Sequence, residues 1–250
     1  MNPNILWVVQ EDLFVENKRH ELLRVLDQMG VKYQTVCISV PEYNIIPEVY
    51  HDGPIITNGS VMLSNIANEK GWRPGSGFNS CFSYNVWFKK LRPYLLNKDA
   101  KFGTLKGTPG LREFFIRPIS DEKSFTGRVI KLSEYDDWRK GYRLDMSVLW
   151  SSVKITGQEH RHFIIDGRVI SSSRYKLNGK PNYSSQVDQF IIDFANKMCS
   201  IWTPSRMFVL DTYVTGDEIG IVELGCFGHA GFYETDIQKI VHAVNQTIGD

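Results

Sequence analysis

Long apolar runs, paired cysteines and a clear excess of either charge are all missing from this sequence of 250 residues. No apolar run approaches the ~18 residues that a membrane-spanning helix needs. The formal net charge is +1, which gives no overall field to attract nucleic acid or an anionic membrane. We therefore expect a globular protein that neither crosses a membrane nor has nucleic acid as a partner.

The four cysteines are scattered along the chain, and no two of them form a CxxC pair. They are Cys37, Cys81, Cys199 and Cys226. This usage is typical of free, mostly buried thiols in a reducing compartment rather than of a zinc site. The first residues contain a short apolar stretch without a basic leader or a small-residue cleavage site, so they predict a strand rather than a signal peptide. We expect a cytoplasmic location, or the host cytoplasm for a phage protein.

Two common signatures of catalysis are absent as well. The sequence contains neither GxxxxGKS nor GxxxxGKT, which excludes a P-loop. It also has no GxSxG elbow and no recognisable pairing of cysteine with histidine, so no covalent nucleophile of the protein is evident.

The first hundred residues alternate between stretches with strand and helix patterns. Apolar strands are expected at 5–9, 31–38 and 54–57, and helices at 16–29 and from Ser60 onward. Gly30 closes the first of these helices. Strands that alternate with helices predict a small parallel sheet, so we interpret residues 1–100 as a small α/β domain.

From about residue 101 the pattern changes to strands joined by tight turns. Strands are expected at 112–117, 128–132 and 147–155. Helices are expected at 133–141, with Ser133 as the N-cap, at 186–202 and at 235–248. Asp166-Gly167 and Thr215-Gly216-Asp217 each stand between two strand runs and predict hairpins. This pattern predicts an α+β body at 101–250, with lobes at about 101–150 and 151–250.

Two acidic residues stand in otherwise apolar strand stretches. Asp211 lies in FVLDTYV and Glu223 lies in IVELG, on the two strands of the second hairpin. Pairing of these strands could bring the carboxylates together, where they would repel each other unless a cation lay between them. Magnesium is the natural cation for carboxylate and phosphate oxygens. The alternative is that one or both side chains simply face solvent.

Basic residues gather at or near strand ends in the same half of the chain. Arg117 and Lys123 flank the first loop, Arg161 lies in QEHRHFII, and Arg174 and Lys176 lie in SSSRYKL. Arginine grips phosphate oxygens in pairs, and lysine acts as a point charge. Together with two carboxylates, these cations would suit a site for a metal-bound nucleotide. Any one of them taken alone is more typical of a solvated sheet edge.

As a set, these motifs resemble the ATP-grasp superfamily, and within it a clade of phages and bacteria with an arginine in place of the nucleotide-binding strand lysine. FFIRPISDEKSFTG resembles that clade's Arg-Pro strand and the glycine-bearing loop after it. EHRHFIIDGRVISSSRYK resembles its Glu-x-Arg hairpin, and FVLDTYV with IVELGCFGHAGFYETDIQKIV resembles its last strands and helix. The matches run in the family's order over about residues 101–250. Residues 1–100 resemble the small α/β domain that precedes an ATP-grasp domain.

The resemblance implies a fold of two α+β lobes that hold ATP between antiparallel sheets, with ATP and magnesium as cofactors. The implied ATP-binding residues are Arg117, Lys123, Glu159, Arg161 and Lys176. The implied metal ligands are Asp211 and Glu223, and the implied catalytic residues are Arg161 and Arg174. The strand at 148–154 would supply the hinge that meets adenine through its backbone.

One departure from the family pattern concerns the metal-binding strand. The family commonly has Glu-x-Asn there, whereas this sequence has Glu223-Leu224-Gly225, so the asparagine ligand is missing. His229, a water or a backbone carbonyl could fill the position, although histidine is a poor magnesium ligand. His229 could also bind the acceptor, act as a base, or have only a packing role in its turn.

The resemblance implies an ATP-dependent ligase that joins a carboxylate to an amine or a thiol through an acylphosphate. The substrates would be small-molecule or peptide carboxylates and amines. Two alternatives stay open: a nucleotide-binding interaction module without turnover, suggested by Gly225, and phosphoryl transfer to an acceptor that is not a carboxylate. The oligomeric state is also open.

Overall fold

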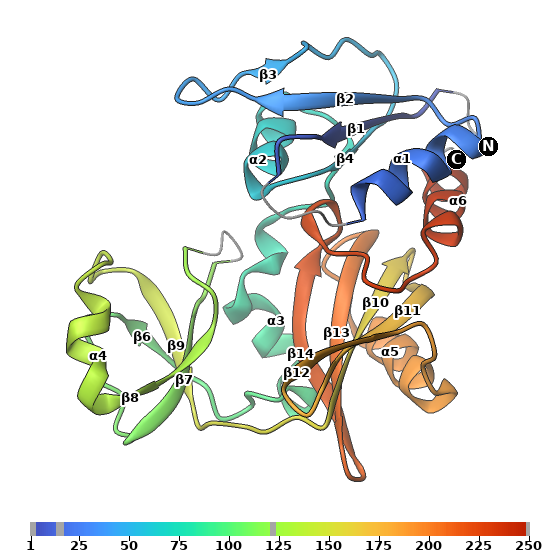
Figure 1. Cartoon of the computed structure of the whole chain (residues 1–250). Helices are drawn as coiled ribbons and strands as arrows, with labels where there is room; N and C mark the ends of the chain where they lie inside the picture. The colour runs from blue at the N-terminus through green and yellow to red at the C-terminus, as the bar shows by residue number, and fades with distance from the viewer. Residues whose placement is uncertain (1–3, 14–17, 121–123, 249–250) are drawn as a thin grey trace.

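Three β-sheets organise the chain in the computed structural model, which describes residues 4–13, 18–120 and 124–248 (Figure 1). The N-terminal sheet has the strand order β3-β2-β1-β4-β5. Its strands are β1 (Leu6–Gln10), β2 (Tyr33–Ile38), β3 (Ile45–Ile46), β4 (Ile55–Asn58) and β5 (Pro74–Gly75). All neighbours are parallel except β3, which runs antiparallel to β2, so the predicted small parallel sheet is confirmed.

Both faces of the N-terminal sheet are buried, as is usual for parallel strands. Along β1, Trp7 and Val9 pack into a core with helices α1 (Arg19–Gln28) and α6 (Ile237–Thr247). Leu6 and Val8 point to the opposite face and pack into a second core with helix α2 (Val61–Glu69). The apolar run of β1 therefore belongs to a strand that is covered on both sides.

The middle sheet is antiparallel, with the strand order β6-β9-β7-β8. Its strands are β6 (Lys101–Thr104), β7 (Glu113–Pro118), β8 (Arg128–Lys131) and β9 (Ser147–Ser151). Helix α4 (Leu132–Arg139) packs against it through Tyr135. The pairing of β7 with β8 confirms the strand pair expected around the polar loop.

The C-terminal sheet is also antiparallel, with the strand order β12-β11-β10-β13-β14. Its strands are β10 (Gln158–Ile165), β11 (Arg168–Leu177), β12 (Lys180–Ser184), β13 (Met207–Thr215) and β14 (Glu218–Cys226). Both predicted hairpins are confirmed. Asp166 and Gly167 turn with φ angles of 46° and 71°, and Gly216 turns with a φ angle of 57°. Aspartate and glycine tolerate these left-handed conformations, which explains why the turns were visible in the sequence.

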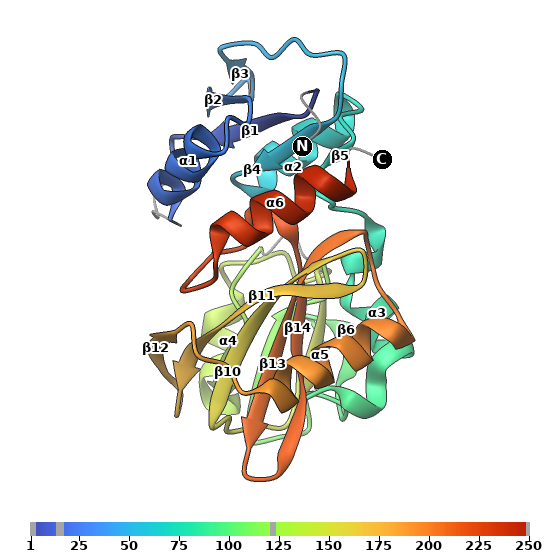
Figure 2. The same ribbon diagram turned by 90° about the vertical axis from the view of Figure 1, so that its right-hand side faces the viewer.

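Helices α5 (Gln189–Ile201) and α6 cover opposite faces of the C-terminal sheet. Helix α5 packs on the face that carries Ile164, Phe208 and Leu210. Helix α6 packs on the other face, against Phe163 and Val209, and also contacts α1. Figure 2 shows α6 between the N-terminal and C-terminal sheets. One apolar core therefore joins these two sheets.

The remaining elements connect the sheets. Helix α3 (Tyr84–Leu91), flanked by the 3-10 helices η1 (Ser80–Phe82) and η2 (Arg92–Tyr94), links the N-terminal sheet to the middle sheet, and η3 (Phe227–His229) follows β14. The sheets lie within residues 6–75, 101–151 and 158–226, while the domain limits expected near 100 and 150 stay predictions. No helix in the described part of the chain is both long and apolar enough to span a membrane.

Two of three expected helix ends are confirmed. Ser60 caps α2 by accepting a hydrogen bond from the backbone N–H of Leu63, and Gly30 follows α1 with a φ angle of 64°. The expected N-cap at Ser133 is wrong. Helix α4 begins at Leu132 with Lys131 at the N-cap position, because Lys131 still belongs to β8 and the strand runs directly into the helix.

Two histidines lie buried on the face of β10 that α5 covers. The ring nitrogens of His162 are hydrogen-bonded to the hydroxyls of Ser172 and Thr212, at 2.7 and 2.9 Å. Burial lowers the pKa of His162 to about 3, with a smaller effect from His160. Burial and then the charge of Arg174 lower the pKa of His160 to about 4. The folded chain therefore keeps both imidazoles neutral at pH 7.

These histidines predict a loss of stability in mild acid. Their pKa returns to about 6.5 on unfolding, so protons bind the unfolded chain first as the pH falls below that value. Each histidine should lower the free energy of unfolding by about 2 kcal/mol between pH 7 and pH 5. Urea denaturation at the two pH values should show that His162→Gln loses correspondingly less stability on acidification. An unchanged pH dependence in this variant would contradict the explanation.

Candidate functional site

A row of charged side chains crosses the C-terminal sheet where its apolar face ends. Arg161 on β10 stands opposite Asp211 on β13, and Asp211 stands opposite Glu223 on β14. Opposite residues on antiparallel strands share a face, and here it is the face on which Phe163 points into the core. We call Arg161, Asp211 and Glu223, together with Arg117 of the middle sheet, the charged row.

Arg161 and Asp211 form the most buried pair of the charged row. The guanidinium donates to both carboxylate oxygens, from Nε at 2.9 Å and from Nη2 at 2.7 Å, and Nη1 donates to the carbonyl of Gly231 at 3.3 Å. The two side chains are only 14% and 5% exposed. The guanidinium also lies 4.9 Å from the ring centre of Tyr233 and 5.8 Å from that of Tyr175. Burial opposes the charge of Arg161, but Asp211 outweighs this effect and raises the pKa of Arg161.

Glu223 receives its arginine from the middle sheet. Arg117, near the end of β7, places Nη2 3.4 Å from Oε1 of Glu223. Arg117 is buried, and its guanidinium lies 5.3 Å from the ring centre of Tyr84. The two neighbouring carboxylates are thus flanked by one guanidinium from their own sheet and one from the facing sheet, which offsets their mutual repulsion.

A cavity of about 340 Å³ lies between the middle and C-terminal sheets, beside the charged row. Its volume falls within the range of about 300–1,000 Å³ that small-molecule sites occupy. We call it the inter-sheet cavity. Its described lining comes from β7, the loop before β8, and strands β10, β11 and β14. Of the residues predicted from the sequence, it brings together Arg117, Glu159, Lys176 and Glu223.

Glu159 organises one wall of the inter-sheet cavity. Its buried carboxylate accepts hydrogen bonds from the hydroxyl of Thr156 at 2.6 Å, the hydroxyl of Tyr175 at 2.7 Å and Nζ of Lys176 at 3.0 Å. Burial, followed by the charges of Asp211 and Glu159, raises the pKa of Tyr175 well above its ordinary value, so this hydroxyl stays a donor. The arrangement holds the ammonium group of Lys176 at the cavity wall.

Arg174 is not among the described residues that line the inter-sheet cavity. A β-bulge at Tyr175 makes Glu159 pair with Lys176 and His160 pair with Arg174. Arg174 therefore shares the face of His160, and it donates to Oδ1 of Asn182 at 2.7 and 3.0 Å. This placement corrects the expectation that Arg174 lies with Arg161 in the site.

Two other expectations concern the loop before β8 and the connection after β9. Lys123 lies outside the described residues, so its contact with ATP stays a prediction. The strand expected at 147–155 ends at Ser151, after which the N–H of Ser152 donates to Asp99 at 3.0 Å. Nζ of Lys154 donates to the same carboxylate at 2.7 Å. Asp99, which no motif had singled out, thus fixes the connection between the two sheets.

Asp211 and Glu223 are the residues that could hold a divalent cation. The described residues contain no group of three or more histidine, cysteine, aspartate and glutamate side chains that could hold a metal ion. Magnesium is commonly held by one or two carboxylates, with phosphate oxygens and waters completing its octahedron. The two carboxylates therefore fit magnesium that arrives with phosphate groups, and they do not form a metal cage of protein ligands alone.

Gly225 and His229 lie close to this pair of carboxylates. Gly225 stands opposite Val209, and a Cβ at position 225 would lie 3.0 Å from Cγ2 of Val209. An asparagine at 225 would therefore crowd Val209. His229 lines a cavity of about 20 Å³ together with three members of the charged row, and its ring centre lies 6.0 Å from that of Phe78. The structure thus puts His229 beside the carboxylates, while its chemical role stays open.

Three tyrosines that sequence reasoning missed stack beside Arg161. The ring of Tyr233 lies between those of Tyr175 and Tyr183, at centre distances of 5.0 and 5.6 Å and interplanar angles of 13° and 17°. The available signal was slight: Tyr175 lies between the two basic residues of SSSRYKL. Only the bulge turns its ring toward Arg161, and the other two rings come from distant parts of the chain.

The chain belongs to a family of ATP-grasp domains, family 3 of its clade, whose model matches residues 38–244. The match includes the strands around the inter-sheet cavity and all four members of the charged row. It begins within the N-terminal sheet, at the last residue of β2. Comparison with curated proteins gives no significant match.

Solved structures of ligases share the fold at low sequence identity. A D-alanine–D-alanine ligase from Coxiella burnetii has a TM-score of 0.68 at 11% identity, covering 100% of this chain and 95% of that one. A RimK domain ATP-grasp protein from Sphaerobacter thermophilus has a TM-score of 0.63 at 9% identity, covering 98% and 96%. The ATP-grasp ligase PsnB, complexed with a minimal precursor, has a TM-score of 0.60 at 12% identity, covering 99% of each chain. These likenesses confirm the expected ATP-grasp fold, with mixed α+β content and antiparallel sheets.

Removal of Arg161 should strongly destabilise the protein near neutral pH. Arg161→Met would leave two neighbouring carboxylates, and loss of one partner of a buried pair costs about 3–5 kcal/mol. Urea denaturation should show a loss of this size at pH 7.5. The loss should shrink at pH 5, because protonation of one carboxylate relieves the repulsion.

Arg206→Met is the matched control. Arg206 makes the same two-pronged contact with Asp166, at 2.8 and 2.9 Å, but these side chains are 58% and 44% exposed. An exposed pair contributes about 0–1 kcal/mol. Equal losses of stability in the two variants would contradict a special role for the Arg161–Asp211 pair.

Proposed function

We propose that the chain is an ATP-dependent ligase that joins a carboxylate to an amine or a thiol through an acylphosphate. The observation that carries the proposal is the charged row beside the inter-sheet cavity. Membership of the ATP-grasp family and likeness to ligase structures support it. The proposed substrates are small-molecule or peptide carboxylates and amines. A PsnB structure with a precursor peptide supports a peptide as one of them.

Arg117 and Lys176 are the proposed contacts for the ATP phosphates. Both line the inter-sheet cavity. Arg117 takes the part of the strand lysine, and its guanidinium can grip two phosphate oxygens at once. Lys176, held in place by Glu159, supplies a second positive charge. Lys123 keeps its predicted part as a third cation, on the loop before β8.

Asp211 and Glu223 are proposed to hold magnesium together with the phosphates. Magnesium would neutralise charge on the phosphoryl group during its transfer. In the structure, Arg161 and Arg117 balance the charges of the two carboxylates. Phosphate groups compete for Arg117, whose contact with Glu223 is the longer and less buried of the two. Nucleotide binding should therefore free Glu223 for the metal.

The proposed reaction has two steps. An oxygen of the carboxylate substrate attacks the γ-phosphorus, the bond to the bridging oxygen breaks, and ADP and an acylphosphate form. The amine then attacks the acyl carbon and loses a proton, and inorganic phosphate leaves. Arg117, Arg161 and Lys176 would stabilise the negative charge that develops on the oxygens in both steps.

Adenine is proposed to meet the backbone just after β9. The pairing of β9 with both β6 and β7 uses the backbone at 148–151, and Asp99 takes the N–H of Ser152. Hydrogen bonds between described residues do not involve the backbone of Val153 or Lys154. These two positions are therefore the proposed contacts within the hinge expected at 148–154.

Nucleotide affinity should separate Lys176 from its near neighbour Arg174. Lys176→Met removes a charge from the cavity wall and should weaken ATP binding by about tenfold or more, since a charge-assisted hydrogen bond contributes about 1.5–3 kcal/mol. Arg174→Met should leave the affinity unchanged, because Arg174 lies on the other face of the sheet. Calorimetric titration with ATP and magnesium compares the two variants. Equal weakening in both would refute the assignment of faces.

Release of ADP tests the function itself. The protein would be incubated with ATP, magnesium and pools of carboxylates and amines, including peptides. We expect ADP to form only when both substrates are present, and Glu223→Gln to abolish its formation. Nucleotide binding without ADP release from any pair would favour the interaction module instead. A phosphorylated product from an acceptor that is not a carboxylate would favour phosphoryl transfer.

A further inference from the structure

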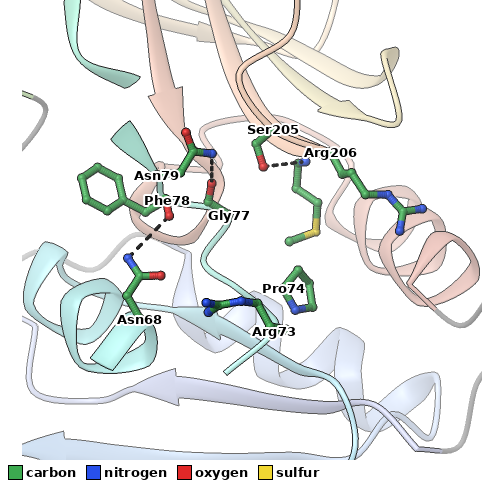
Figure 3. A pocket seen from close by; sticks show the side chains of 9 residues that line it. Asn68, Arg73, Pro74, Gly77, Phe78, Asn79, Ser205 and Arg206 are labelled. Carbon is green, nitrogen blue, oxygen red and sulfur yellow. Dashed lines mark hydrogen bonds between the residues drawn. The ribbon is translucent and has the colours of Figure 1, made fainter. Parts of the chain in front are cut away.

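A second pocket, of about 450 Å³, lies where the N-terminal sheet meets the start of β13 (Figure 3). Its walls come from α2, from the segment 73–79 that includes β5, and from residues 205–207. We call it the β5 pocket. It has no described lining residue in common with the inter-sheet cavity, so it is a separate site.

The β5 pocket carries one uncompensated positive charge. Its described lining includes two arginines and no acidic residue. Arg206 is paired with Asp166, and Figure 3 shows its guanidinium pointing away from the other lining residues. Arg73 has one hydrogen bond to a described residue, from Nη1 to the carbonyl of Trp72 at 2.9 Å, and no described carboxylate pairs with it.

Polar and apolar groups are both available around this charge. Figure 3 shows the side chain of Arg73 running toward Asn68, whose Nδ2 makes a long contact of 3.5 Å with the carbonyl of Phe78. The hydroxyl of Ser205 accepts from the N–H of Met207 at 3.4 Å, which leaves its proton for an acceptor. Phe78 and Met207, with the ring of Pro74, supply apolar surface.

Close packing of the backbone fixes the walls of the β5 pocket. Gly77 has a φ angle of 77°, and a Cβ there would lie 2.7 Å from the carbonyl oxygen of Met207, so the approach requires glycine. Nδ2 of Asn79 donates across to the carbonyl of Pro204 at 3.0 Å. A site whose walls are already in place loses little free energy to ordering when it binds a ligand.

We propose that the β5 pocket binds a small organic carboxylate. Arg73 would hold the carboxylate through paired hydrogen bonds, and the apolar body would pack against Pro74, Phe78 and Met207. A single free positive charge matches a monoanion, whereas a phosphate dianion calls for more than one cation. The ring of Phe78 also contacts that of His229, so the occupant would share a wall with the charged row while staying outside it. This site does not depend on the proposed ligase activity.

Benzoate is the probe for this site. Calorimetric titration of the full chain should show saturable binding of benzoate. Arg73→Gln should weaken that binding by at least about tenfold, through loss of the charge-assisted contact. Because Arg73 is exposed, the variant should keep the melting temperature of the wild type. Arg24→Gln, which removes an exposed arginine of α1, is the matched control and should bind benzoate normally.

Three results would overturn the proposal. The first is the absence of saturable benzoate binding to the wild-type protein. The second is equal binding by Arg73→Gln and Arg24→Gln. The third is displacement of benzoate by inorganic phosphate at an equal concentration, which would show a general anion site rather than a carboxylate site.

Discussion

The contact between Arg161 and Asp211 is the interaction on which the site depends. Both side chains lie where the apolar face of the C-terminal sheet ends, and they are 14% and 5% exposed, so neither can be charged there without the other. Strand register then places Glu223 directly beside Asp211. A second negative charge at that position requires a second cation, and Arg117 supplies it from the facing sheet. The four charges of the row therefore balance, and the sheet can present two carboxylates side by side.

The same row also links the two sheets that enclose the inter-sheet cavity. The contact between Arg117 and Glu223 crosses from one sheet to the other at 3.4 Å, and the covalent connection after β9 is fixed by Asp99. Burial opposes the charge of Asp99, but hydrogen bonds from Lys154 and Ser152 lower its pKa to about 2. The connection is thus held at physiological pH, while the longer contact across the cavity is the one that an incoming phosphate can replace. The Arg161–Asp211 pair, shorter and more buried, would stay in place.

Most of the fold could be predicted because its signals are local. Asp166-Gly167 and Gly216 mark hairpins through conformations that few other residues adopt, and the apolar pattern of β1 indicates a strand covered on both faces. The pairing of Asp211 with Glu223 followed from the second hairpin in the same way. The fate of Arg174 could not be predicted, since a bulge at Tyr175 separates the faces of two residues that the sequence puts close together. Partners from distant segments, such as the stacked tyrosines and Asp99, leave no periodic trace in the sequence.

Titration of magnesium into the protein, with and without a non-hydrolysable ATP analogue, tests the central claim most directly. The claim is that arginines balance the two carboxylates until phosphate takes Arg117. It predicts no measurable binding of magnesium alone to the wild-type chain, clear binding once the analogue is present, and binding without the analogue in Arg117→Met. Tight binding of magnesium to the wild-type protein without nucleotide, unchanged in Arg117→Met, would contradict it.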